Sequence, residues 1–447
     1  MSSRVPSRVG SLLFLVILCS LGCAGKAPPV LDRLVRLQPK TPVVIVPGFS
    51  GSMILDPHGE KIVWGTAGPL FFPSDGGYAL ALPLGQQERE RQGYEAFDVI
   101  RTMRIGPLKV DVYGKLITVL EANGYRLGDL DDPTPDATLF VFPYDWRYNN
   151  VAAAADLTEK LLNLQRVRGD STLRLDLICH SNAARIARYM MKYGNASLED
   201  AESGRARPPA GLHVEKLLLV GTANGGATNG FRNMLQGRSY APLIGRKITP
   251  EVAFSFEAAF ETLPAYRDQL FFDASGAALD VDLFDAANWQ RYGWSIYAAS
   301  VESRLRKRAR DDLFGDAGTR REHLERGLDR ARRLHDVLVR DVPGFPRARY
   351  YLVQNAYRKT PDRVLLRRDR KGRWETLFFP QRPLGKGPLF SLASAPGDGH
   401  ATVASQHWLS PQETAALAHG TLYVPSYHRG IVHHVTTHRA ILEYLLE

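Results

Sequence analysis

The stretch LRLDLICHSNAARIARYMMKYG, residues 173–194, changes its hydrophobic pattern near its middle. Leucine stands at every second position up to Leu177, as in a strand, whereas small and apolar residues recur at helical spacing after residue 183. Ser181 lies at the change, where a sharp strand-to-helix turn would expose its hydroxyl and place the amide of Asn182 beside a developing oxyanion. Ser181 is therefore a candidate nucleophile, but a polar turn without catalytic importance would explain this stretch alone equally well.

The composition is that of a globular protein with a basic balance. The chain has 447 residues, 44% of them hydrophobic, and of the possible domain counts we favour one elaborated domain. Lys and Arg number 57 against 47 Asp and Glu, an excess that suits anionic lipid headgroups or simply a solvated surface. No nucleic-acid-binding module accompanies this charge, so we expect no nucleic acid partner.

The first 26 residues have the pattern of a secretory leader. Arg4 and Arg8 precede an apolar run over 12–18 that is too short for a comfortable membrane span. Gly22 and Cys23 follow it and resemble the bacterial lipobox, in which the cysteine is lipidated and becomes the new N-terminus. We expect a signal peptide over 1–23, lipidation of Cys23, a linker over 24–40 and a lipid-anchored protein of the bacterial cell envelope, on the outer membrane or the periplasmic face. The alternatives are an uncleaved N-terminal anchor and secretion without an anchor.

Buried strands alternate with helical patterns over much of the remaining chain. Apolar runs at 43–46, 138–142, 214–220 and 350–354 are typical of buried strands, and amphipathic patterns at 112–121 and 152–167 are typical of helices. This alternation predicts an α/β domain over 41–447 with a mostly parallel, doubly wound sheet. Residues 227–345 interrupt it with aromatic stretches and arginine-rich helices, whose charges we expect mostly to pair at the surface. We predict that this insertion is a helical cap over the active-site end of the sheet.

Three further loops could complete a site around Ser181. Phe49 lies on a glycine-rich turn after the first strand, and its amide is our candidate for the second oxyanion donor. Asp398 lies on a glycine-flanked loop after the apolar run 389–392, and His428 follows the last predicted strand. Ser181, Asp398 and His428 stand in the chain order of nucleophile, acid and base in α/β-hydrolases, so we predict an α/β-hydrolase with this catalytic triad.

Other side chains compete for two of these roles. Asp176 and Asp145 are rival acids, but the first lies within a strand and the second comes too early in the chain. His180 is adjacent to the serine, and adjacent side chains point apart, so we interpret it as pocket lining. The rival bases lie in or just before the closing helix, and we favour His428 over His433, His434 and His438. No third ligand accompanies the His434 and His438 pair, so we expect no metal.

These residues resemble those of the lecithin:cholesterol acyltransferase-like α/β-hydrolases, which include phospholipid:diacylglycerol acyltransferases and lysosomal phospholipase A2. The resemblance implies transfer of a fatty acyl group from a glycerophospholipid to an alcohol or to water, through an acyl-serine, at a membrane surface and without a cofactor. It rests on the Pro-Gly-Phe-Ser-Gly-Ser run at 47–52, on 113–120 with 124–125, on Pro-Tyr-Asp-Trp-Arg at 143–147, on His180 and Ser181, on Gly221 and Thr222, on 397–399 and on the C-terminal histidine loop.

The chain also departs from the family pattern. The turn has Cys179, Asn182 and Ala183 where the family usually shows Gly, Met and Gly, Ala223 replaces a proline, and the acid loop carries two extra residues. Two other functions therefore stay open. One is an esterase or peptidase acting on a small soluble substrate, and the other is a non-catalytic envelope lipoprotein with a degenerate hydrolase fold.

Overall fold

The computed structural model describes residues 29–71, 73, 75–84, 93–105, 108–239, 247–307, 313–345 and 347–447. The predicted signal peptide and the lipidation site Cys23 lie outside the described residues. The described part of the predicted linker contains the short helix α2 (Arg33–Leu37), which is capped by Asp32. None of the helices in these ranges is both long and apolar enough to cross a bilayer.

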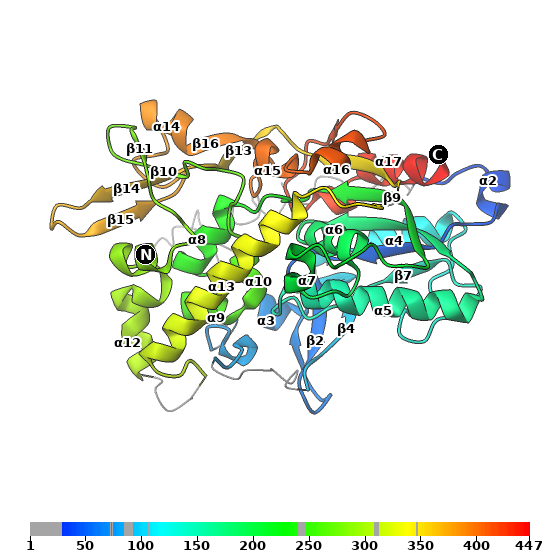
Figure 1. Ribbon diagram of the computed structural model, residues 1–447, viewed down its shortest axis with the longest axis horizontal. Coiled ribbons are helices and arrows are strands. Elements are labelled where there is room, and N and C mark those ends of the chain that lie inside the picture. Colours follow the sequence, from blue (N-terminus) through cyan, green and yellow to red (C-terminus); the bar gives the residue numbers. More distant parts are fainter. Residues whose placement is uncertain are drawn as a thin grey trace, which may run out of the picture.

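A six-stranded parallel sheet forms the centre of the molecule (Figure 1). The chain starts in β1, adds β7 on one side, and then adds β8, β9, β12 and β17 on the other. This doubly wound order confirms the predicted α/β fold class. The strands are β1 (Val43–Val46), β7 (Leu139–Val141), β8 (Leu173–His180), β9 (Leu212–Val220), β12 (Arg349–Gln354) and β17 (Leu422–Tyr423).

Helices cover both faces of this sheet, as the unbroken apolar sequences of its strands require. Val44 and Val46 of β1 belong to one buried apolar cluster, and Val43 and Ile45 belong to another on the opposite face. Helices α5 (Asn150–Arg168) and α6 (Ala183–Tyr193) contribute to the first cluster, and α4 (Gly114–Ala122) and α17 (Val435–Leu446) contribute to the second. Ser181 lies just before α6, and every residue of this helix is buried.

Small elements fill the connection between β1 and α4. The residues described in this connection form a three-stranded antiparallel sheet and a separate hairpin, together with a helix and a 3-10 turn. They are β2 (Ser52–Leu55), β3 (Ile62–Trp64), α3 (Ala67–Phe71), η1 (Tyr78–Leu80), β4 (Glu95–Val99), β5 (Thr102–Ile105) and β6 (Leu108–Asp111).

The region predicted as a cap is mostly helical. Its longest helix, α13, crosses the front of the molecule in Figure 1. The elements are α8 (Thr228–Gln236), α9 (Pro250–Ser255), α10 (Glu257–Glu261), β10 (Phe271–Phe272), β11 (Ala278–Leu279), α11 (Ala286–Tyr292), η2 (Ser295–Tyr297), α12 (Ala299–Lys307) and α13 (Ala317–Leu338).

A second insertion, which the sequence did not reveal, follows β12. Its strands β14 (Val364–Arg368) and β15 (Trp374–Leu377) join β10 and β11 in a four-stranded sheet that projects from the molecule (Figure 1). Strands β13 (Arg358–Pro361) and β16 (Ser394–Gly397) form a separate antiparallel pair. The remaining short elements are α7 (Leu198–Glu202), α14 (Pro388–Ala393), α15 (Val403–Gln406), α16 (Pro411–Ala415) and η3 (Ile431–His433).

The apolar run 389–392, which precedes Asp398, forms part of helix α14. Pro388 occupies the first turn of this helix, where its fixed φ favours helix and its missing amide is not needed. Leu389 and Leu392, three positions apart, both pack against the small apolar cluster of the second insertion. Asp398 instead follows β16, so it does not belong to the edge of the central sheet.

Candidate active site

Ser181 occupies a tight turn between β8 and α6. Its φ is +56°, a left-handed conformation that costs roughly 1–3 kcal/mol in a residue other than glycine and is typical of functional sites. The turn packs closely against the loop after β1, because a Cβ added to Gly48 would lie 2.8 Å from the Cβ of Ser181. Cys179 and Ala183 are fully buried. The small residues on both sides of Ser181 therefore fit the crowded backbone of this turn.

The structure brings Ser181, His428 and Asp398 together in one chain of hydrogen bonds. The Oγ of Ser181 lies 2.9 Å from Nε2 of His428, and Nδ1 of the same ring lies 2.7 Å from Oδ2 of Asp398. The other carboxylate oxygen, Oδ1, accepts the amides of His400 and Ala401, each at 2.7 Å. Because the buried carboxylate can only accept from Nδ1–H, the imidazole keeps Nε2 free to accept the serine proton.

The two predicted oxyanion donors both lie beside Ser181 in the chain or in space. In the loop after β1, the Gly48 amide donates to the hydroxyl of Tyr113 at 2.9 Å, and the Gly51 amide donates to the Gly48 carbonyl. The amides of Phe49 and Asn182 have no hydrogen-bond partner among the described residues. Both amides are thus available to a ligand oxygen.

His180 connects the loop after β1, here called the oxyanion loop because it contains Phe49, with the loop of His428. The Tyr113 hydroxyl accepts from the Gly48 amide, so its own proton goes to Nδ1 of His180, 2.8 Å away. His180 then carries its proton on Nε2, which faces the His428 carbonyl at 3.4 Å. Burial and the neighbouring His428 lower the pKa of His180 to about 3, so this ring stays neutral. Its role is wider than the pocket lining that we predicted.

The rival acids have other partners, as do His434 and His438 among the rival bases, whereas Nδ1 of His433 is buried without a hydrogen-bond partner among the described residues. Asp176 is buried in β8 at 3.8 Å from Nζ of Lys216, and Asp145 forms an ion pair with Arg147. His434 caps α17, and the ring of His438 donates to the carbonyl of Val432. The described residues contain no group of three side chains suited to hold a metal ion.

A polar network that the sequence did not reveal lies beneath the turn. The side chain of Asn182, 2% exposed, donates to Asn150 at 2.6 Å and accepts from Arg185 at 2.8 Å. Arg185 also donates to the carbonyl of Ala223 at 2.6 Å, and burial lowers its pKa to about 10. Two of the departures from the family pattern, Asn182 and Ala223, are therefore connected through one arginine.

His400 is a further residue at the site that sequence reasoning missed. Its ring lies 4.5 Å from the ring of His428, and burial holds its pKa well below the ordinary value. Asn229 on α8 donates to the carbonyls of Gly399 and His400. The lengthened acid loop, which contains His400 and Ala401, was the sequence signal for this role. The structure shows that the amides of these two residues donate to Asp398.

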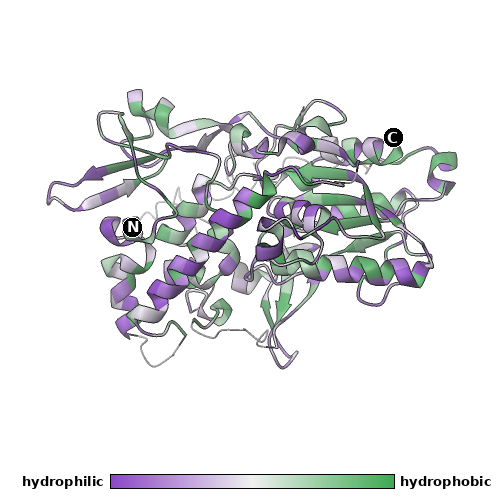
Figure 2. Ribbon diagram, viewed as in Figure 1, coloured by the Kyte–Doolittle hydropathy of each residue, from purple (hydrophilic) through white to green (hydrophobic). Residues whose placement is uncertain are grey.

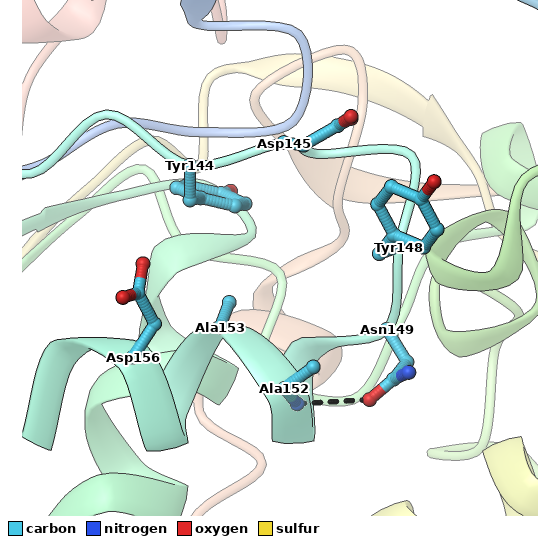
Figure 3. A pocket seen from close by; sticks show the side chains of 7 residues that line it. All are labelled: Tyr144, Asp145, Tyr148, Asn149, Ala152, Ala153 and Asp156. Carbon is cyan, nitrogen blue, oxygen red and sulfur yellow. Dashed lines mark hydrogen bonds between the residues drawn. The ribbon is translucent and has the colours of Figure 1, made fainter. Parts of the chain in front are cut away.

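A small pocket lies next to the network, between the end of β7 and the start of α5 (Figure 3). Its volume of about 90 Å³ suits a few water molecules rather than an acyl chain. It shares Tyr144 with the site, because the Tyr144 hydroxyl lies 3.4 Å from the side-chain amide of Asn182. The lining residues are Tyr144, Asp145, Tyr148, Asn149, Ala152, Ala153 and Asp156.

Comparisons with known proteins agree with this architecture. A family model described as "Lecithin:cholesterol acyltransferase" matches residues 81–281. A chain in the solved structure "The crystal structure of Tle4-Tli4 complex" has a similar fold, with a TM-score of 0.55 and 14% identity, over 91% of this chain and 97% of that chain. No curated protein matches the sequence significantly. Over residues 81–281 the chain is therefore similar to the lecithin:cholesterol acyltransferase family, and its fold is that of a lipase-like α/β protein, which together support the general class of lipid acyl hydrolases and acyltransferases.

Proposed function

We propose that this protein cleaves a fatty acyl ester of a glycerophospholipid through an acyl-enzyme on Ser181. The observation that carries the proposal is the continuous hydrogen-bond chain from Ser181 through His428 to Asp398, with the serine held at a positive φ between a strand and a helix. The family match supports a lipid ester as the substrate.

The geometry suggests a role for each group. Oγ of Ser181 attacks the ester carbonyl while Nε2 of His428 takes its proton, and Asp398 stabilises the imidazolium that forms. The amides of Phe49 and Asn182 stabilise the oxyanion. The tetrahedral intermediate then expels the lysophospholipid alcohol, which receives the proton from His428. Water or a second alcohol enters with the same base and releases the acyl group from Ser181.

The proposal places this reaction at a membrane surface of the bacterial cell envelope. Acyl chains on Cys23 would anchor the protein there, because two or more chains hold a protein on a bilayer far longer than one. Mass spectrometry of the N-terminal peptide from membranes tests the anchor. A lipidated Cys23 would support it, and an unmodified N-terminus downstream would indicate secretion without an anchor.

Replacing Ser181 with Ala tests the reaction. We expect the unchanged chain to release fatty acid or acylated alcohol from mixed phospholipid vesicles, as followed by mass spectrometry, and Ser181→Ala to release none. Ser203→Ala changes an exposed serine at the end of α7 and serves as the matched control, which we expect to remain fully active.

Two other results would contradict the proposal in different ways. If short esters are cleaved at a rate that does not rise above the micellar concentration, and phospholipids are not cleaved, the protein is an esterase for a small soluble substrate. If a fluorophosphonate probe labels neither the unchanged chain nor Ser203→Ala, the protein is a non-catalytic envelope lipoprotein.

A further inference from the structure

One segment of the chain has a large excess of positive over negative charge. Residues 355–391, called here the basic segment, contain ten Lys and Arg residues and three Asp and Glu residues, a net charge of +7. The whole chain has a net charge of +10. The basic segment runs from β13 to α14 and includes the projecting β14 and β15 hairpin, whose tip is hydrophilic in Figure 2.

The three carboxylates of the basic segment are already engaged. Asp362 binds Arg267, Asp369 binds Arg373 and Glu375 binds Arg367. The other eight cations form no ion pair with any residue that the structure describes. Seven of these eight are exposed, among them Arg370, Lys371, Arg382 and Lys386. The basic segment thus presents positive charge that the protein itself does not neutralise.

The arginines of the cap helices behave differently. On α12 and α13, Arg306, Arg321 and Arg326 each lie within ion-pair distance of a glutamate one turn away. Arg304 binds the buried carboxylate of Glu251. These helices confirm the surface pairing predicted for the arginine-rich region, and their charge is largely balanced locally.

The basic segment begins at the rim of the active site. Arg358 pairs in register with Gly397, the residue before Asp398, and its guanidinium lies 3.9 Å from the ring centroid of Tyr427, the residue before His428. Tyr357 and Tyr427 are 66% and 60% exposed, although a tyrosine is usually at least partly buried. Exposed tyrosines beside unpaired cations are typical of surfaces that meet the interface of a bilayer.

We infer that the basic segment, together with Tyr427, is the surface by which this protein docks on a bilayer of anionic lipids. This inference rests on the proposed function, because a lipid substrate must reach Ser181 from such a surface. Charge complementarity selects the partner, since unpaired Lys and Arg residues attract anionic headgroups. A nucleic acid would also attract the cations, and its bases stack on exposed aromatic rings, but it would give no reason for this surface to begin beside the loops of Asp398 and His428.

Vesicle binding tests this surface without depending on catalysis. The full chain carries Ser181→Ala in every sample, so that the lipids stay intact, and Cys23→Ser, so that lipidation adds no affinity. Partition is measured by flotation with vesicles of phosphatidylcholine alone and of phosphatidylcholine and phosphatidylglycerol in equal parts.

The test variant combines Arg370→Gln, Lys371→Gln, Arg382→Gln and Lys386→Gln. The matched control combines Arg306→Gln, Lys307→Gln, Arg321→Gln and Arg326→Gln, which removes the same charge from exposed positions of α12 and α13.

We expect the test variant to lose at least about tenfold in partition onto the phosphatidylglycerol vesicles, and the control to lose less than about threefold. Partition onto phosphatidylcholine alone should be the same for all three proteins. Equal losses in the test and control variants would overturn the assignment, as would equal binding to the two kinds of vesicle. Tighter binding of the same chain to duplex DNA than to phosphatidylglycerol vesicles, lost in the test variant, would assign the surface to nucleic acid instead.

The outcome is separable from that of the proposed function. Each charge variant is also prepared with Ser181 intact and assayed on a monomeric short ester, which needs no bilayer. If the protein cleaves this ester, but the test and control variants bind vesicles equally well, the docking surface is refuted and the proposed reaction is not. A chain that cleaves no ester while the test variant loses vesicle binding refutes the proposed reaction and leaves the docking surface supported.

Discussion

At the scale of single residues, the site depends on groups that never contact the substrate. The hydroxyl of Tyr113 accepts from the amide of Gly48 and donates to His180, so one oxygen joins the oxyanion loop to the residue before Ser181. Because the phenol is buried and its pKa is raised by that burial, it remains protonated and can make both hydrogen bonds at any ordinary pH.

Replacing Tyr113 with Phe tests this positioning role. Without the hydroxyl, the Gly48 amide loses its partner and the Phe49 amide is held less firmly, so we expect kcat on a monomeric ester to fall about tenfold or more with KM little changed. Tyr189→Phe is the control, because Tyr189 is also buried and its hydroxyl donates to the carbonyl of Ala196. A parallel rise in KM, or an equal fall in kcat for both variants, would indicate a merely structural role.

Some of these residues could be predicted from the sequence and others could not. Ser181, Asp398 and His428 were found because hydrolases place them in a fixed chain order on loops. Asn229 was missed because its contact with His400 joins segments about 170 residues apart, and no local pattern reports such a contact. Arg185 was missed for another reason, since an arginine in a helix usually faces solvent, whereas this one is 2% exposed.

At the scale of elements, the buried strand β8 contains an ionisable side chain, that of Asp176. Asp176 is fully buried, neither of its carboxylate oxygens accepts a hydrogen bond from the described residues, and burial raises its pKa to about 7. Lys216, at 3.8 Å, compensates only in part. The strand nevertheless forms because its other inward residues are apolar and it pairs with both β1 and β9, although its register with β9 shifts between Leu175 and Asp176.

This carboxyl group predicts a pH dependence of stability. Its pKa is higher in the folded than in the unfolded protein, so folding is favoured most when the group is neutral. The contribution of this one group to the free energy of unfolding therefore declines as the pH rises from about 4 to about 7, by an amount on the order of 2–4 kcal/mol, and is level above that. We expect Asp176→Asn to remove most of this decline, as measured by urea unfolding at pH 5 and pH 8.

The exposed carboxylate Asp170, which follows α5, provides the control for that experiment. Asp170→Asn should leave the decline unchanged, since the group is exposed and pairs with Arg168 at the surface. A profile of Asp176→Asn that matches the unchanged protein would show that Asp176 is not the group responsible.

Short elements were harder to predict than long ones. The strands β1 and β9 were expected because continuous apolar runs of this length fit strands covered on both faces, and β8 was expected because its leucines alternate with other residues. The run at 389–392 has only four residues, and such a run fits a helical turn as well as a strand. Pro388 was the sign of a helix start, and its weight became clear only when Leu389 and Leu392 were seen on one face.

At the scale of the whole molecule, net charge was informative only after it was placed in space. The sequence shows a net charge of +10 but not where unpaired cations lie, and arginines are most frequent in the helices of the predicted cap. The cap neutralises many of its cations with glutamates and aspartates, whereas the basic segment does not. Frequency of a residue type therefore gave less information than the partners of each side chain.

Ionic strength should act on the protein only when a bilayer is present. The Debye length falls from about 30 Å at 0.01 M salt to about 3 Å at 1 M, so salt screens the attraction between the basic segment and anionic headgroups. We expect hydrolysis of phosphatidylglycerol vesicles to slow at least about fivefold over this range, while hydrolysis of a monomeric ester changes less than about twofold. A similar response of both substrates would place the salt effect in the active site.

The attachment of Asp398 has a consequence for protein engineering. Its strand, β16, pairs with β13 and not with the central sheet. A chimera that grafts the whole insertion after β12 from one homologue to another would transfer Asp398, the acid of the proposed triad, together with that insertion. A recombination boundary between β13 and residue 394 would take these two paired strands from different parents. Exchanges of this insertion should therefore keep β13 and β16 from the same parent.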